Sequence, residues 1–157
     1  MNKQKIWVAV SVAAAIVFCL FLFFNSAQDA TASTEISNVF VDVIIPVLTF
    51  FGFMCDELTV SFYVRKSAHF LGYFALTLLL YSLFKRFVSK KLALFVSPLI
   101  SLLIAIFDEF VIQRNSAGRS PEWRDVIIDL SGATVAMLLI VLVSKVKSKK
   151  YKKGEDR

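Results

Sequence analysis

The residues best suited to chemistry lie close together in an otherwise apolar part of the chain. His69, the one histidine among 157 residues, follows Arg65 and Lys66 and precedes Tyr73. If this stretch is helical, Lys66, His69 and Tyr73 at positions i, i+3 and i+7 share one face. A histidine held by carboxylates can act as a general base or a nucleophile. The segment therefore predicts an inward-facing polar stripe with catalytic potential.

Carboxylates and further cations follow in two later segments. Asp108 and Glu109 end an apolar run, with Gln113 four residues after Glu109, and Asp125 and Asp129 open the next run. An ionised Asp129 facing hydrocarbon would cost at least about 2.5 kcal/mol, so it should face the protein interior beside a histidine or arginine. Arginine side chains in this region are suited to binding phosphate. The candidate catalytic residues are His69, Asp108 and Glu109, and the candidate substrate-binding residues are Arg65, Lys66, Tyr73, Gln113, Arg119, Arg124, Asp125 and Asp129.

The composition identifies the chain as a membrane protein. Hydrophobic residues make up 57% of it and charged residues 19%, and the mean hydropathy is +0.69. A soluble domain is less apolar and more charged, and a disordered chain needs low hydrophobicity. Two cysteines, Cys19 and Cys55, exclude a disulfide scaffold and a four-cysteine zinc site. The sequence assigns no cofactor, and a metal requirement stays open.

Four apolar runs predict an all-α membrane protein with four transmembrane helices. At 1.5 Å per residue, residues 6–24 reach roughly 28 Å, enough for a bilayer core of about 30 Å. A cleaved signal peptide is the alternative for this run, but its apolar stretch exceeds the usual length and lacks a good cleavage site. We expect one domain, residues 1–143, followed by a basic tail. The predicted spans are residues 6–24, 68–84, 92–107 and 126–143, and the tail is residues 144–157.

The distribution of positive charge predicts the orientation in the membrane. Thirteen of the 18 Lys and Arg residues fall in the N-terminus, the 85–91 loop and the 144–157 tail. Cytoplasmic loops retain positive charge, so both termini should be cytoplasmic in a multi-pass protein of the cell membrane. A basic tail can also bind nucleic acid, but lysines beside a span more simply stop translocation and contact anionic lipid. We therefore expect the lipid bilayer, and no nucleic acid, as a partner.

The segment 39–55 is apolar but is interrupted by polar and helix-breaking residues. Asp42, Pro46 and Gly52 lie within it. A fifth span here would place the basic 85–91 loop outside, against the charge pattern. We therefore predict an interfacial or re-entrant segment in the first outer loop, covering the bundle.

Several polar stretches carry ordered motifs. They are Arg65-Lys66-Ser67-Ala68-His69-Phe70 with Tyr73, Asp108-Glu109-Phe110 with Gln113, Gly118-Arg119-Ser120, Arg124-Asp125-Val126 with Asp129 and Gly132, and the stretch with Ser26, Gln28, Ser33 and Ser37. These stretches resemble motifs of the VanZ-like family of small bacterial membrane proteins, named for a protein associated with low-level teicoplanin resistance. The second motif has one residue more than the family's D-E-x-x-Q. The resemblance implies a role in the cell envelope that reduces the effect of a lipoglycopeptide, but no particular reaction.

Three functions are compatible with these residues. The first is a membrane-embedded enzyme acting on a lipid headgroup or a lipid-linked cell-wall precursor. The second is a non-catalytic binder of such a lipid, of a precursor or of an amphiphilic drug. The third is a small transporter or flippase with Asp129 and His69 as a proton relay. A purely structural alternative is that the polar residues only hold three helix ends together.

The predicted orientation can be tested by cysteine labelling after replacement of the native Cys55. A cysteine introduced in the 85–91 loop should resist a membrane-impermeant thiol reagent in intact cells, because this loop carries four of the retained positive charges. A cysteine at Ser120 should be labelled. The reverse labelling pattern would overturn the orientation and the external placement of the polar residues.

Overall fold

The protein is almost entirely helical in the computed structural model, which describes residues 3–155. The all-α prediction is confirmed. A five-residue π-helix and one 3-10 turn connect the fourth helix to the fifth. The elements are α1 (Lys3–Ser26), α2 (Ala30–Phe50), α3 (Glu57–Phe84), α4 (Lys90–Phe107), the π-helix η1 (Asp108–Ile112), the 3-10 turn η2 (Gln113–Asn115) and α5 (Trp123–Glu155).

Side-chain caps explain where three of these helices begin. Asp29 accepts a hydrogen bond from the Ala32 backbone N–H at the start of α2, and Ser89 accepts one from Leu92 at the start of α4. At α3, Asp56 accepts from both the backbone N–H and the hydroxyl of Thr59. These bonds satisfy donors that the first turn of a helix leaves free. The Thr59 bonds also hold the pKa of the Asp56 carboxyl below its usual range.

The helices differ from the predicted spans mainly in length. The helix α3 begins at Glu57, well before residue 68, and α5 continues unbroken past residue 143, so the described part of the basic tail prolongs it. Most of the segment predicted as 39–55 belongs to α2, which starts at Ala30, passes through Asp42 and Pro46 and ends at Phe50. By length and composition, five helices of the described chain are able to cross a membrane, α2 among them.

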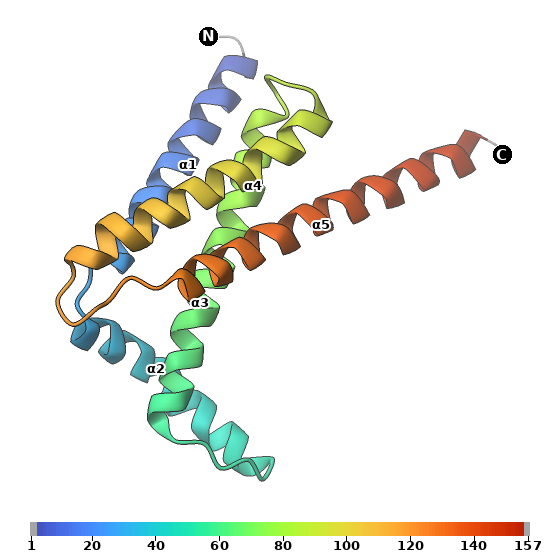
Figure 1. Ribbon diagram of the computed structural model, residues 1–157. Helices are drawn as coiled ribbons and strands as arrows, with labels where there is room; N and C mark the ends of the chain where they lie inside the picture. Colours follow the sequence, from blue (N-terminus) through green and yellow to red (C-terminus); the bar gives the residue numbers. More distant parts are fainter. Residues whose placement is uncertain (1–2, 156–157) are drawn as a thin grey trace.

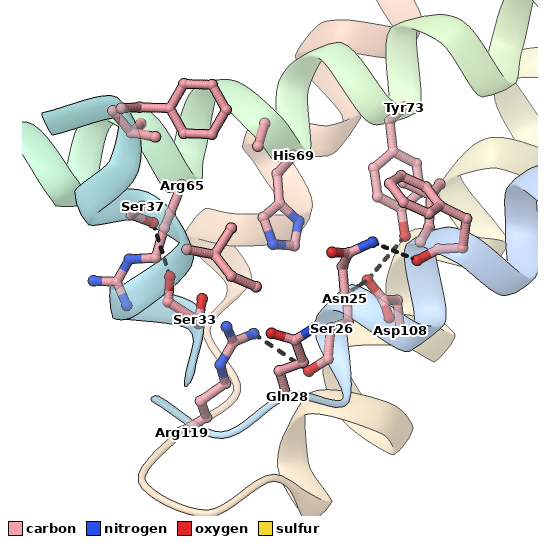
Figure 2. A pocket seen from close by; sticks show the side chains of 16 residues that line it. Asn25, Ser26, Gln28, Ser33, Ser37, Arg65, His69, Tyr73, Asp108 and Arg119 are labelled. Carbon is pink, nitrogen blue, oxygen red and sulfur yellow. Dashed lines mark hydrogen bonds between the residues drawn. The ribbon is translucent and has the colours of Figure 1, made fainter. Parts of the chain in front are cut away.

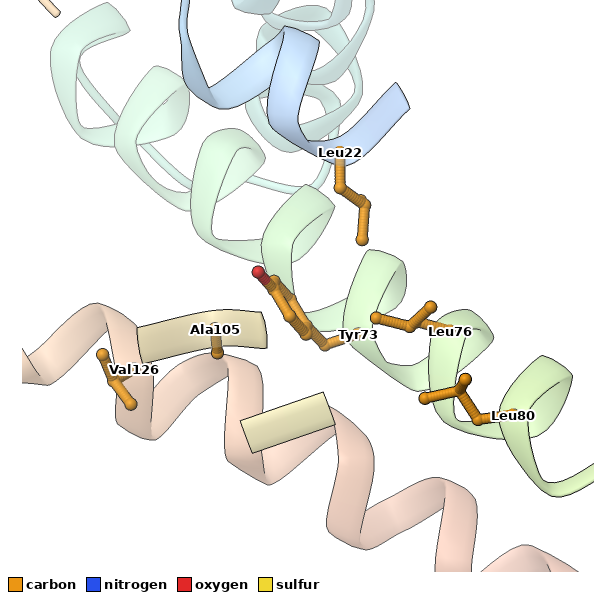
Figure 3. Packing of buried hydrophobic residues seen from close by; sticks show 6 residues of the cluster. All are labelled: Leu22, Tyr73, Leu76, Leu80, Ala105 and Val126. Carbon is orange, nitrogen blue, oxygen red and sulfur yellow. The ribbon is translucent and has the colours of Figure 1, made fainter. Parts of the chain in front are cut away.

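The helix α3 is the centre of the bundle. It contacts α1, α2, α4 and α5, and its contact with α5 is the most extensive. The apolar core in Figure 3 joins Leu22 of α1 and Ala105 of α4 to side chains of α3 and α5; its α3 and α5 members are Tyr73, Leu76, Leu80 and Val126. In Figure 1, α2 leaves the bundle and crosses the N-terminal half of α3, while α5 projects beyond the bundle at its C-terminal end.

A glycine allows α5 to lie directly against the α3 backbone. A Cβ atom placed on Gly132 would lie 2.2 Å from the carbonyl oxygen of Phe70 and 3.2 Å from the nitrogen of Phe74. Ala133 and Ala136, the neighbouring residues on α5, are fully buried. Small residues permit such close approach of two membrane helices. The motif residue Gly132 therefore lies at a close contact between α3 and α5.

Substitution of this glycine should separate α3 from α5. Gly132→Ala places a methyl group inside the contact distance of a backbone carbonyl, so the protein should lose about 1–3 kcal/mol or more of stability. Thermal unfolding in detergent measures this loss. Thr134→Ala, on the exposed side of the same helix, is the matched control and should change stability little. Parental stability of Gly132→Ala would show that the two backbones are not in contact.

Candidate functional site

Three residues of α3 each meet a carboxylate from another element. Lys66 forms an ion pair with Asp125 of α5. One turn further on, Nδ1 of His69 lies 3.3 Å from Oδ1 of Asp129. The predicted polar stripe on α3 therefore faces the bundle, and Asp129 has the basic partner that its position within an apolar run requires.

Asp108 provides the third of these contacts and joins three elements. The Tyr73 hydroxyl of α3 donates to Oδ2 of Asp108 at 3.2 Å, and the Ser26 hydroxyl at the end of α1 donates to the same oxygen at 2.7 Å. The Asp108 side chain is completely buried. Its Oδ1 and both carboxylate oxygens of Asp129 have no hydrogen bond from the described residues. Buried polar atoms are rarely left without a partner, so this region has spare capacity to accept hydrogen bonds.

Glu109 lies in the π-helix η1, and Gln113 is the residue that follows η1 and begins η2. The Gln113 amide donates to Oε2 of Glu109, and the backbone N–H of Glu122 donates to Oε1 at 2.7 Å. Glu109 is fully buried by these contacts. It therefore holds both ends of the segment between η1 and α5.

Arg119 extends from this segment toward the end of α1. Its Nη1 donates to Oε1 of Gln113 at 3.0 Å and to the carbonyl of Ser26 at 3.3 Å. The preceding residue, Gly118, has a φ of +72°, which lets the chain turn there without the strain that a side chain would add. Burial lowers the pKa of the Arg119 guanidinium, and the positive charge of Arg65 lowers it further. Two arginine side chains therefore influence each other across this region.

Some of these side chains line a cavity of about 180 Å³. Figure 2 shows the His69 ring pointing into it from α3, with Asp108 and Ser26 on one side and Arg119 entering from the connecting segment. We call it the polar cavity. Its polar lining residues are Asn25, Ser26, Gln28, Ser33, Ser37, Arg65, His69, Tyr73, Asp108 and Arg119; its apolar ones are Phe21, Leu22, Ile36, Phe40, Val64 and Ala68.

The structure brings together some, but not all, of the predicted site residues. Of the candidate catalytic residues, His69 and Asp108 line the polar cavity and Glu109 does not. The side chains of Asp108 and Glu109 are both fully buried. The predicted residues that line the cavity are Arg65, His69, Tyr73, Asp108 and Arg119; those that do not are Lys66, Glu109, Gln113, Arg124, Asp125 and Asp129.

Sequence reasoning underestimated the polar residues around the start of α2. Ser33 and Ser37, one turn apart on α2, both line the polar cavity, as do Asn25 and Gln28. Only their resemblance to a Ser/Gln-rich stretch pointed to the serines and Gln28, and no signal pointed to Asn25. Because α2 begins at Ala30, the four-residue spacing of Ser33 and Ser37 places both hydroxyl groups on one face of the helix. In the described chain, no group of three or more His, Cys, Asp or Glu side chains is placed to hold a metal ion.

Comparison with known proteins identifies the family. The family model VanZ/LLP1 matches residues 11–144, which include every helix in whole or in part and all lining residues of the polar cavity. The chain belongs to the VanZ/LLP1 family. Together with its apolar helices, this makes it a membrane protein. No curated protein and no solved structure gave a significant match.

The hydrogen bonds to Asp108 can be tested for their contribution to the stability of this VanZ/LLP1 protein. Tyr73→Phe removes one donor from a buried carboxylate and should destabilise the fold by about 1–3 kcal/mol. Tyr63→Phe, which alters an exposed tyrosine of the same helix, should have an effect below about 0.5 kcal/mol. Equal stability of the two variants by thermal unfolding would show that the Tyr73 hydroxyl does not support Asp108.

Proposed function

We propose that the protein crosses the bacterial cell membrane four times, with both termini cytoplasmic and α2 covering the outer surface. The domain would comprise residues 1–143, with residues 144–157 as its cytoplasmic tail. Lys85, Lys90 and Lys147 line one cavity between α3, α4 and α5, so basic residues from two predicted cytoplasmic segments meet at one end of the bundle. The polar cavity is lined by the C-terminal end of α1 and by Asp108, which follows the end of α4 opposite to Lys90. This separation supports an outward-facing site.

We further propose that the polar cavity binds the headgroup of a membrane lipid or a lipid-linked cell-wall precursor. The observation that carries this proposal is the lining itself, in which Arg65 and Arg119 lie among hydroxyl and amide side chains next to apolar residues. Guanidinium groups bind phosphate or carboxylate through charge-assisted hydrogen bonds, and the apolar residues suit the remainder of a lipid. Binding of an envelope lipid is compatible with the role in glycopeptide tolerance, of the teicoplanin type, that the VanZ-like resemblance implies.

A catalytic function is the second candidate, favoured by the contact between His69 and Asp129. A carboxylate beside Nδ1 fixes the orientation of the imidazole and leaves Nε2 on the opposite side of the ring, where a general base would receive a proton. The ring points into the polar cavity (Figure 2). Asp108 would contact the substrate from the same cavity, whereas Glu109 would act as a positioning residue, because its contacts are with Gln113 and Glu122.

Two conservative substitutions distinguish binding from catalysis. The measurement is the teicoplanin susceptibility of a bacterial host that expresses each variant, together with the thermal stability of the purified protein. Arg65→Gln should abolish the tolerance conferred by the parent whether the protein is a binder or an enzyme, because the substitution removes the cation that would bind an anionic headgroup. His69→Gln should abolish it for an enzyme and retain much of it for a binder. Arg114→Gln, an exposed arginine near the cavity, is the control and should behave as the parent.

Other outcomes would contradict the proposal. Full tolerance in both Arg65→Gln and His69→Gln would exclude the polar cavity from the function. A loss of tolerance that follows an equal loss of thermal stability in each variant would instead show that these side chains only hold the helix ends together.

A further inference from the structure

The polar cavity adjoins a second cavity between α2 and α3. This second cavity, of about 500 Å³, shares Phe40, Val64 and Ala68 with the polar cavity. We call it the apolar groove. Because three residues line both, the two spaces adjoin along the α2 and α3 interface, where α2 crosses α3 in Figure 1.

One stripe of α2 lines both spaces and changes from polar to apolar along its length. Ser33 and Ser37 line the polar cavity, Phe40 lines both spaces, and Ile44 and Leu48 line the apolar groove. Their spacings of three or four residues place all five on one side of the helix. From Ser33 to Leu48 this stripe is about 22 Å long. Along the axis of α2, the polar cavity and the apolar groove together therefore change from a polar end at Ser33 to an apolar end at Leu48.

The opposite wall of the apolar groove has a similar character. It is formed by α3, where Val60, Tyr63 and Leu71 are among the lining residues and Thr59 and Ser67 supply single hydroxyl groups. None of the described residues that line the groove is charged. Such a surface favours hydrocarbon over water.

The polar end carries positive charge that has no carboxylate partner among the described side chains. The ion pairs found there are Lys66 with Asp125 and His69 with Asp129. Arg65 and Arg119 take part in neither, and both line the polar cavity. Asp108, the carboxylate that lines the cavity, is engaged by Ser26 and Tyr73. An anion between the two guanidinium groups would relieve their repulsion.

We propose that the ligand is a phosphate-bearing amphiphile that binds with its phosphate between Arg65 and Arg119 and with its hydrocarbon chain in the apolar groove between α2 and α3. Charge complementarity selects the headgroup, and the apolar groove next to the polar cavity, with three lining residues in common, selects a ligand that carries a long chain. This inference rests on the headgroup binding proposed above and adds the substrate class. The chain extends from Phe40 toward Leu48 along the stripe of α2.

Three probes separate the contributions of headgroup and chain. Hexadecyl phosphate carries both, butyl phosphate carries the headgroup with a chain too short to fill the groove, and hexadecyl trimethylammonium carries the chain with the opposite charge. Their dissociation constants can be measured by native mass spectrometry of the full chain released from a zwitterionic detergent. We expect hexadecyl phosphate to bind the parent protein at least tenfold more tightly than either of the other two.

Two variants and a matched control locate the contacts. Ser67→Trp fills the apolar groove and should weaken hexadecyl phosphate at least tenfold while leaving butyl phosphate unchanged. Arg65→Gln should weaken both phosphates at least tenfold. Ser131→Trp makes the same replacement at an exposed position of α5 that lines none of the cavities, and should bind as the parent does.

The possible failures are distinguishable. Unchanged hexadecyl phosphate binding in Ser67→Trp, with both phosphates lost in Arg65→Gln, would overturn the groove and leave the headgroup site standing. Phosphate binding that is insensitive to Arg65→Gln would overturn the headgroup site as well. Equal binding of hexadecyl trimethylammonium and hexadecyl phosphate to the parent would show unselective lipid contact and overturn the proposed substrate class.

A second groove variant keeps the test decisive if Ser67→Trp does not fold. Leu48→Trp shortens the groove at its far end, so it should weaken hexadecyl phosphate but leave octyl phosphate unchanged. Equal affinity of Leu48→Trp and the parent for hexadecyl phosphate would show that the chain does not follow α2.

Discussion

The burial of carboxylates among apolar helices is the constraint on which the rest of this structure depends. Asp108 and Asp129 are almost completely enclosed, and an acidic group in such a place requires donors or a basic partner nearby. His69 and Tyr73 supply these contacts from α3. The requirement explains why α3 is central, since its polar stripe must meet α5 and η1 at once. The close approach at Gly132 brings the α5 backbone near enough for the contact with Asp129 to form.

Sequence reasoning predicted the features that follow from local spacing and from the cost of charge in apolar surroundings. The shared face of Lys66, His69 and Tyr73 and the inward position of Asp129 are of this kind. The all-α fold follows from the apolar runs. The sequence did not predict that α3 begins at Glu57. The capping residue Asp56 and the first turn of α3 lie outside the apolar run from which the span was predicted.

The features that could not be predicted depend on contacts between distant segments or on unusual helix geometry. Whether Glu109 faces the cavity is decided by the backbone of Glu122, thirteen residues later. The extra residue between Glu109 and Gln113, relative to the family motif, coincides with the π-helix, and the Gln113 amide still donates to the Glu109 carboxylate. The chain continues helically through Pro46 in α2, although proline usually disrupts a helix interior.

The contacts that hold α2 to the bundle determine how the protein responds when a ligand fills the polar cavity and the apolar groove. This helix packs chiefly on α3, and its first residue is tied to the segment before α5 by the hydrogen bond from Ala30 to Ala117. It nevertheless supplies one wall of both the polar cavity and the apolar groove. Any molecule that touches both walls stabilises the docked arrangement by mass action. Protection of the α2 amides from hydrogen exchange would then report directly on the fraction of sites filled.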